Sequence, residues 1–378
     1  MPATALPFSS RRRRLLAAAA ASCAGPLFVR HAGADGHARF ALGVASGQPR
    51  PDRLVLWTRL TGLDLPERAE VRWELAHDEA FTQIAARGTE TAEAAWAHSV
   101  HAEPGGLAPG RGFFYRFEAL GQRSAVGRTR TAPAPDASAT LRFAIASCQR
   151  WDHGHYAAWR HLAEADTPDL VMFLGDYIYE YPSGPHALRA HDGPLLRTLD
   201  QYRARYAQYK SDPALQAAHA ACPWILVWDD HEVENDYANE RGQHGSSGFL
   251  LQRAAAYQAY WEHQPFPNSM RPQRSDMRIV QRFDWGRLAR IHALDDRQYR
   301  DPQACVPMLR GGGSTTVALK DCPQLLDARR TLLGTAQERW LDAGWDTTRP
   351  WNLVAQQTLM ARLSWGDPAT NPTYWTDG

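Results

Sequence analysis

A run of acidic side chains directly follows an apolar stretch near the middle of the chain. The segment PWILVWDDHEVENDY passes from apolar residues into five carboxylates and one imidazole, which are Asp229, Asp230, His231, Glu232, Glu234 and Asp236. Carboxylates that are crowded together repel one another unless cations lie between them. The composition of this segment therefore indicates a metal site.

Two further apolar runs also end at side chains that bind metal ions. LRFAIASCQ ends at Cys148, and LVMFLGDYIY ends at Asp176 and Tyr179. In open α/β sheets, sites form in the crevice at the carboxyl ends of the strands. We therefore expect these side chains to meet Asp230 and His231 at one site. Taken singly, each residue is explained as readily by a core, turn or cap position, and only their joint occurrence favours a site.

The elements that must position these residues divide the chain in two. Residues 38–131 hold short alternating or apolar runs separated by Gly, Pro and Asp, which is typical of a β-sandwich. TAPAPDASAT, residues 131–140, has the composition of a linker. Residues 141–378 alternate apolar strands with helical segments such as 155–165 and 199–209. This alternation predicts an α/β layer with a buried, largely parallel sheet.

Length and composition limit the classes of protein that fit. The 378 residues exceed one ordinary domain, and an apolar content of 44% with a charged content of 22% is that of a globular rather than a disordered chain. The formal net charge is only +1, so no overall field favours nucleic acid, and no nucleic-acid-binding patch is evident. Any function that depends on charge must therefore be local.

Residues 1–34 are typical of an export signal. Four arginines, residues 11–14, precede an Ala-rich apolar run too short to span a bilayer, and residues 32–34 offer a small-residue cleavage site. The arginine run resembles a twin-arginine signal, which predicts the twin-arginine export machinery as a partner. A periplasmic or extracellular location and a mature form without a transmembrane helix follow. General secretion, or a lipoprotein with Cys23 as its lipidated first residue, are the alternatives.

The remaining cysteines form two groups. Cys305 and Cys322 flank the Gly-rich, polar segment VPMLRGGGSTTVALKD, which has little to order it except its ends. In an exported protein this arrangement predicts a disulfide-closed loop, and two buried free thiols are the alternative. Cys148 and Cys222 lie in apolar, strand-like runs, where a cysteine on its own is usually a small core residue.

Seven segments together resemble the PhoD-type alkaline phosphatases and phosphodiesterases of the metallophosphoesterase superfamily. They are FALGVASGQPRPDRLVLWTRL, FAIASCQRW, FLGDYIYEY, VWDDHEVENDY, ALDDRQYRD, LLGTAQERWL and WNLVAQQTLMA, and the resemblance runs from about residue 38 to the last residue. It implies an N-terminal Ig/fibronectin-like β-sandwich, residues 38–131, followed by a metallophosphatase-type αββα sandwich, residues 141–378. It also implies export by the twin-arginine route, with Fe3+ and Ca2+ as cofactors.

The resemblance implies roles for the site residues as well. Cys148 and Tyr179 are similar to ligands of the iron, and Asp176 is similar to the carboxylate that bridges iron and calcium. Anionic thiolate and phenolate suit a trivalent ion, and carboxylate oxygens suit calcium. Asp230 takes a metal or phosphate role. His231 takes the role of the residue that stabilises the transition state or protonates the leaving alcohol.

Further side chains in the same motifs are candidates for the surroundings of the site. Asn235 is a candidate contact for calcium or phosphate. Arg297 is a candidate phosphate clamp because guanidinium matches phosphate oxygens bidentately, and an ordinary ion pair with Asp295 or Asp296 is the alternative. The other acidic residues of the run are expected around the site or at the surface: Asp229, Glu232, Glu234 and Asp236.

These inferences predict an exported, metal-dependent phosphate ester hydrolase, an alkaline phosphatase or phosphodiesterase that uses a metal-activated water. A non-enzymic exported metal-binding or surface protein and an iron oxidoreductase are the alternatives. In the resembling family a Gly-Asp-x-His motif completes the metal shell, and none occurs after Trp351. We therefore expect residues 141–378 to be a truncated metallophosphatase domain that, in the 378-residue chain alone, binds metal poorly and hydrolyses little.

Overall fold

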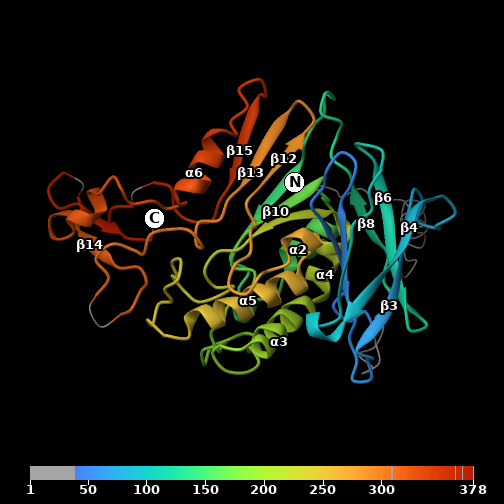
Figure 1. Ribbon diagram of the computed structural model, residues 1–378, viewed down its shortest axis with the longest axis horizontal. Coiled ribbons are helices and arrows are strands. Elements are labelled where there is room, and N and C mark those ends of the chain that lie inside the picture. Colours follow the sequence, from blue (N-terminus) through green and yellow to red (C-terminus); the bar gives the residue numbers. More distant parts are fainter. Residues whose placement is uncertain (1–38, 308–309, 362, 368, 378) are drawn as a thin grey trace, which may run out of the picture. The chain divides into compact units, whose positions relative to one another are not determined.

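A computed structural model describes residues 39–307, 310–361, 363–367 and 369–377 (Figure 1). The predicted export signal, residues 1–34 with Cys23, lies outside the described residues. The described chain mixes helices and strands, as the α/β expectation requires. Among these residues, no helix is both long and apolar enough to cross a membrane.

The three strands that precede the predicted site residues lie side by side in one six-stranded sheet. The sheet has the order β5 (Ser99–Ala102), β2 (Val55–Arg59), β1 (Val44–Gly47), β11 (Pro223–Val227), β10 (Leu170–Leu174) and β9 (Phe143–Ala146). β9, β10 and β11 run parallel, with Met172 of β10 opposite Ile145 and Ile225. Since parallel strands end at the same edge of a sheet, the residues that follow these three strands come together there.

The sequences of β10 and β11 explain why they form the centre of this sheet. LVMFL is buried at its first four positions, and PWILV is buried at all five. Unbroken apolar runs of this length suit strands that are covered on both faces. β9 is the outermost strand, and its Phe143 and Ile145 are exposed.

Strands from the N-terminal part enter the same sheet. β1 pairs in parallel with β11, where Ser46 lies opposite Pro223, and it pairs antiparallel with β2. β2 in turn pairs antiparallel with β5. The sheet therefore contains strands from both sides of the predicted linker, residues 131–140.

A second, antiparallel sheet packs on the first three of these strands. It consists of β4 (Ile84–Glu93), β3 (Arg68–Ala76), β6 (Gly112–Ala119), β7 (Gln122–Arg123) and β8 (Gly127–Arg130). β3 alternates exposed and buried residues along RAEVRW, as its alternating sequence predicts. Its Val71 and Leu75 share one apolar core with Val44 of β1 and Leu56 of β2. The N-terminal strands thus form two facing layers.

Helices with clear sequence signals supply the aromatic side chains that pack on the central sheet. α3 (Leu199–Lys210) begins at Thr198, whose side chain forms a capping box with Gln201, and α4 (Pro213–Ala221) begins after Asp212, which caps it. α2 (Ala157–Glu164) and α5 (Phe249–His263) complete this group. α3 and α5 contribute six buried rings to this core: Tyr202, Tyr206, Tyr209, Tyr257, Tyr260 and Trp261.

The C-terminal part adds a smaller sheet and a covalent loop. β12 (Gln281–Trp285), β13 (Ala289–Ala293) and β15 (Trp351–Ala355) form a three-stranded sheet with α6 (Thr335–Asp342) drawn beside it (Figure 1). β14 (Thr316–Ala318) pairs antiparallel with β16 (Thr373–Trp375). A disulfide joins Cys305 and Cys322, as the sequence predicts, with the two Cα atoms 6.0 Å apart.

Candidate active site at the ends of three parallel strands

The backbone bends sharply where β9 and β10 end. Cys148 and Asp176 both adopt a left-handed conformation, each with φ of 57°. The amide of Cys148 donates to the carbonyl of Gly175, 3.1 Å away, and so links the two strand ends. A Cβ on Gly175 would lie 2.4 Å from the amide nitrogen of Asp229, so only glycine fits between β10 and the acidic run. Left-handed non-glycine residues concentrate at functional sites, because their strain must be held by the surrounding structure.

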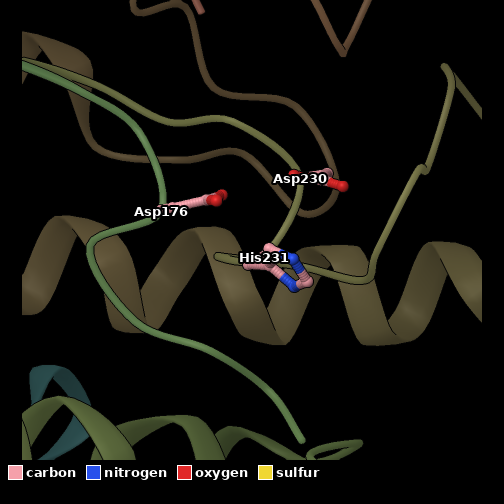
Figure 2. Close-up of side chains that lie close together, drawn as sticks. All are labelled: Asp176, Asp230 and His231. Atoms are coloured by element: carbon pink, nitrogen blue, oxygen red, sulfur yellow. The ribbon is translucent and has the colours of Figure 1, made fainter. Parts of the chain in front are cut away.

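Three potential cation ligands meet at this edge of the sheet. Ligand atoms of Asp176, Asp230 and His231 all lie within 4.8 Å of one another. Figure 2 shows the Asp176 carboxylate pointing from the loop after β10 toward the segment that carries the other two. The sequence-based expectation that these residues converge agrees with this geometry. The group is a possible metal site.

The hydrogen bonding of Asp176 fits a cation at this position. Its Oδ2 accepts a hydrogen bond from the Tyr179 hydroxyl, 2.8 Å away, whereas its Oδ1 is buried without a hydrogen-bond partner. A buried carboxylate oxygen without a partner is costly, and a cation removes that cost. Burial and the neighbouring Asp230 raise the pKa of Asp176 well above its usual range, and a bound cation would favour the ionised form.

Cys148 and Tyr179 lie beside this group. The Cys148 thiol interacts with the Asp176 carboxylate and with the Tyr179 hydroxyl. Partial burial, followed by the charge of Asp176, raises the pKa of Cys148 to about 11, and burial raises that of Tyr179 as well. Cys148 is exposed, so the explanation of this residue as a core cysteine is wrong. When ionised, the Cys148 thiolate and the Tyr179 phenolate could add two anionic ligands to this group.

His231 is held by a buried glutamate that the sequence analysis did not single out. Its Nδ1 lies 2.7 Å from Oε2 of Glu180, which is fully buried and also accepts from the amide of Asn235 at 2.7 Å. The imidazole ring packs against the ring of Tyr179, with centroids 4.2 Å apart. Burial alone would lower the pKa of His231, but Asp230 and Glu180 raise it to about 10. The imidazole is therefore held in one orientation and favours its protonated form.

The signal for Glu180 was present in the sequence. It is the only charged residue in the stretch YIYEY, directly after Tyr179. A charged side chain within an aromatic run is buried only when it is paired. Asn235, which the sequence assigned to calcium or phosphate, contacts Glu180 through its backbone, and its side chain is half-buried.

Glu232, Glu234 and Asp236 of the acidic run are buried, and Asp229 is half-buried. Glu232 accepts from the amides of Tyr177 at 2.5 Å and Asp229 at 2.9 Å, and so joins the segments after β10 and β11. Glu234 pairs with Arg197 at 2.7 Å. Of the two positions expected for Glu232 and Glu234, around the site or at the surface, their burial supports the first, and each has several donors within the fold.

Arg297 is part of the same buried charge network. Its Nε donates to Asp229 at 2.6 Å, and its two terminal nitrogens donate to the two oxygens of Asp377 at 2.9 and 2.8 Å. One of them also lies 3.8 Å from Asp230. Burial alone would raise the pKa of Asp230, but Arg297 and His231 lower it to about 2.

These contacts correct the prediction that Arg297 clamps phosphate. The guanidinium is buried and committed to carboxylates, so it keeps Asp229 and Asp230 in place instead. The predicted ion pair with Asp295 is also wrong, because Arg297 contacts Asp295 through its backbone amide, at 3.0 Å, and not through its guanidinium. No sequence signal singled out Asp377, which is 80 residues away along the chain.

Comparison with known proteins places the chain in a family. Residues 143–378 match the model of the PhoD-like phosphatase, and residues 26–133 match that of the PhoD-like phosphatase N-terminal domain. These matches cover most of the chain. The protein therefore belongs to the PhoD-like phosphatase family.

Two relatives sharpen this assignment. Alkaline phosphatase D of Bacillus subtilis (strain 168) is 45% identical over 354 residues, which are 89% of this chain and 59% of that protein. A solved structure of PhoD, also 45% identical, superposes with a TM-score of 0.83 over 90% of this chain and 66% of that chain. The chain thus spans less than two thirds of the length of either relative.

Proposed function

We propose that this protein is an exported, metal-dependent phosphate ester hydrolase, with Fe3+ and Ca2+ beside Asp176 and Asp230 and with His231 as the catalytic acid rather than a metal ligand. The observation that carries the proposal is the convergence of these three side chains within 4.8 Å, with the buried Oδ1 of Asp176 left without a partner. The similarity to a protein named alkaline phosphatase D supports the reaction class.

The ligand types divide between the two proposed ions. Asp176 would contact both, Cys148 and Tyr179 would add thiolate and phenolate to the iron, and Asp230 would add a carboxylate. When bound, the ions lower the pKa of a water nucleophile and neutralise charge on the phosphate. The remaining steps belong to the chain itself.

His231 supplies the proton in this proposal. Glu180 occupies Nδ1, which leaves Nε2 as the nitrogen that can donate to the leaving alcohol oxygen. The carboxylates of Asp230 and Glu180 raise the pKa of His231 and so favour the protonated imidazole that a general acid requires. Glu180 does not touch the ester in this scheme and acts as the residue that orients the acid.

The export and domain assignments belong to the same proposal. The arginine run at residues 11–14 supports passage through the twin-arginine machinery to a periplasmic or extracellular location. Residues 38–131 are proposed as an Ig/fibronectin-like domain, supported by their two facing antiparallel layers, and residues 141–378 as the metallophosphatase domain.

A spectroscopic and kinetic comparison tests the site. The protein is supplied with Fe3+ and Ca2+, and its visible absorption and hydrolysis of p-nitrophenyl phosphate are measured for the unsubstituted chain and for single variants. Tyr179→Phe should remove or shift the iron–phenolate band, whereas His231→Ala should keep the band and lower hydrolysis. Tyr181→Phe is the matched control, because the Tyr181 ring also contacts His231 but its hydroxyl faces Gln243.

Two results would count against the proposal in different ways. Equal spectra for Tyr179→Phe and Tyr181→Phe would remove Tyr179 from the ligand set. A metal-loaded protein with the expected band that hydrolyses no phosphate ester at all would instead contradict the reaction class.

A further inference from the structure

The described part of the disulfide-closed segment, residues 305–307 and 310–322, contacts the loop that follows the acidic run. The backbones of Gly311 and Gly245 are so close that a Cβ on Gly311 would lie 2.1 Å from the Cα of Gly245. The amide of Gly312 donates to the carbonyl of Gln243 at 3.2 Å. The glycines of this segment are therefore needed for close backbone contact with residues 242–245.

A short chain of hydrogen bonds connects this segment to the candidate cation group. Ser314 donates twice to Oδ2 of Asp236, from its amide at 3.0 Å and from its hydroxyl at 2.7 Å. The amide of Asp236 in turn donates to Oδ2 of Asp230 at 2.5 Å. Asp236 is buried and left-handed, with φ of 53°, so its conformation depends on these contacts.

We propose that Ser314 and Asp236 are positioning residues for Asp230, and that the Cys305–Cys322 disulfide keeps them in place, so that its reduction weakens cation binding at the site. The statement about cation binding rests on the proposed function. The statement about the position of Asp236 does not, because it concerns only the hydrogen bonds of the chain.

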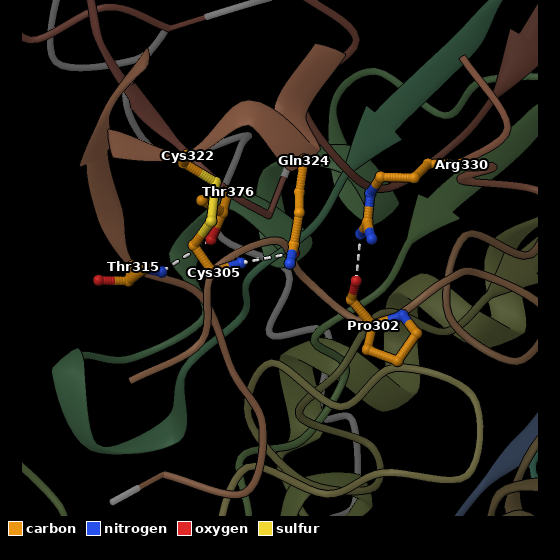
Figure 3. Close-up of a disulfide and its surroundings, with 7 residues drawn as sticks. All are labelled: Pro302, Cys305, Thr315, Cys322, Gln324, Arg330 and Thr376. Carbon is orange, nitrogen blue, oxygen red and sulfur yellow. Dashed lines mark hydrogen bonds between the residues drawn. A yellow bond between two sulfur atoms is a disulfide. The ribbon is translucent and has the colours of Figure 1, made fainter. Parts of the chain in front are cut away.

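The disulfide is the main link at the beginning of the segment. Cys305 has one backbone link there, in which its amide donates to Oε1 of Gln324 at 3.2 Å. Further along, Thr315 is fixed by two hydrogen bonds to Thr376, at 2.9 and 3.0 Å (Figure 3). Just before the segment, the Gln303 side chain donates to the carbonyl of Asp236 at 2.8 Å. Opening the disulfide would thus remove the covalent connection at the beginning of the stretch that carries Ser314 and leave hydrogen bonds alone to hold it.

A reductant has access to this bond from one side. Cys305 is partly exposed, whereas Cys322 is buried. A dithiol reductant attacks the disulfide and breaks the S–S bond. The reductant supplies two electrons and two protons, so both cysteines become thiols and the reductant itself becomes a disulfide. The other two cysteines of the described chain, Cys148 and Cys222, are already free thiols and are not changed by this step.

Amide hydrogen exchange tests the positional statement without metal or substrate. Exchange over residues 230–248 is compared in the oxidised and the dithiol-reduced protein, and in Ser314→Ala with its disulfide intact. We expect exchange at the Asp236 amide to accelerate about tenfold in the reduced protein and in Ser314→Ala, because the hydrogen bond of this amide opens more often. Ser246→Ala is the matched control, since the Ser246 hydroxyl contacts only the nearby Gly248 amide, at 3.2 Å.

Cation affinity tests the consequence for the site. Calcium and iron binding are measured by calorimetry for the same proteins, and loss of the supporting contacts should weaken binding roughly tenfold. The double variant Cys305→Ser/Cys322→Ser should resemble the reduced protein and show no further change with dithiol. This insensitivity excludes an effect of the reductant on the metal itself.

Each result decides one part of the proposal. Unchanged exchange at Asp236 in both the reduced protein and Ser314→Ala would overturn it, whatever the metal content. Faster exchange with unchanged cation affinity would overturn the link to the site. If reduction unfolds the whole protein, as circular dichroism would show, Ser314→Ala decides alone because its disulfide remains. An absence of cation binding in every protein, oxidised included, would reject the proposed metal function and with it the reduction effect on binding.

Discussion

Charged side chains on the antiparallel sheet and charged side chains at the candidate site lie in opposite surroundings. On the antiparallel sheet, pairs such as Arg72 with Glu70 and Arg123 with Glu118 are largely exposed. At the site, Arg297 and its partner Asp377 are both buried. Exposed pairs contribute little to stability, whereas each buried charge must be paired to offset its lost hydration.

The difference shows that the buried carboxylates at the site cost free energy of folding and raises the question of why they are buried. Glu180 and Glu232 are buried, and each carboxylate has two hydrogen-bond donors within the fold. Apolar residues of similar size would fill the same space without needing partners. The placement of so many carboxylates at one sheet edge is therefore best explained by chemistry rather than by stability.

Removal of Arg297 should give the largest effect. Arg297→Met leaves Asp229 without its cation and removes one of the two arginines that pair with Asp377, which should lower the free energy of unfolding by about 3–5 kcal/mol. The change is measured by urea denaturation. Arg123→Met, on the antiparallel sheet, is the control and should change little. Equal losses in the two variants would remove the distinction between the two regions.

The disulfide should have the next largest effect. Cys305 and Cys322 are 17 residues apart, and closing a loop of this size restricts the unfolded chain by about 3 kcal/mol. Cys305→Ser/Cys322→Ser should therefore unfold at lower urea concentration than the oxidised protein. Peptide mapping is the direct check: alkylation of both cysteines without reductant would show that the bond is absent.

Neutralisation of Glu180 should reduce the reaction rather than the stability of the fold. Glu180→Gln keeps the shape of the side chain but removes the negative charge that orients His231 and favours its protonated form. Hydrolysis should therefore fall roughly 10- to 100-fold. The measurement is kcat for p-nitrophenyl phosphate at saturating metal, with the melting temperature as a check on folding. Glu70→Gln, an exposed glutamate of β3, should leave kcat unchanged. A fall in both variants would point to a general effect of charge.

Acid should weaken the fold through a buried histidine near the site. Burial, followed by Arg205, lowers the pKa of His191 from 6.5 to about 4. When the pH falls below 6.5, His191 becomes protonated in the unfolded chain but stays neutral in the folded chain. The stability that is present above that pH is therefore lost on acidification. Between pH 7 and 5.5 the loss should be about 1 kcal/mol from this residue.

A pair of histidine variants checks this assignment. His191→Gln should reduce the dependence of the unfolding free energy on pH in that window by the share of this one residue, because burial also lowers the pKa of His101, His219 and His263. His77→Gln, in the exposed end of the antiparallel sheet, should keep it. The same slope in both variants would assign the acid sensitivity to other groups.

The strands could be predicted from the sequence because their signals are local. LVMFL and WILV are apolar runs bounded by polar residues, and they became β10 and most of β11. The convergence of Asp176 with Asp230 and His231 then followed from the rule that parallel strands end together. The order of strands could not be predicted this way, since nothing local to β1 indicates that it pairs with β11.

The partners of the site residues, unlike the strands, could not be predicted from the sequence. Sequence spacing suggested Asp295 or Asp296 for Arg297, but its guanidinium contacts Asp229 and Asp377, which are 68 and 80 residues away. Likewise, Ser314 reaches Asp236 across 78 residues. Contacts of this range depend on how whole segments pack, and no periodicity of residue types encodes them.

The residues that end the strands, the cysteines that close a loop and the chemistry favoured by the acidic run are all readable from the amino-acid sequence, because apolar patterning and residue type act over a few positions. The contact of Glu180 with His231, the support that Arg297 gives to carboxylates rather than phosphate, and the connection of the disulfide segment to Asp230 through Asp236 depend on the folded chain. The physical reason is that a buried charge takes whichever partner the packing brings within hydrogen-bond distance, and that distance is set by the fold as a whole.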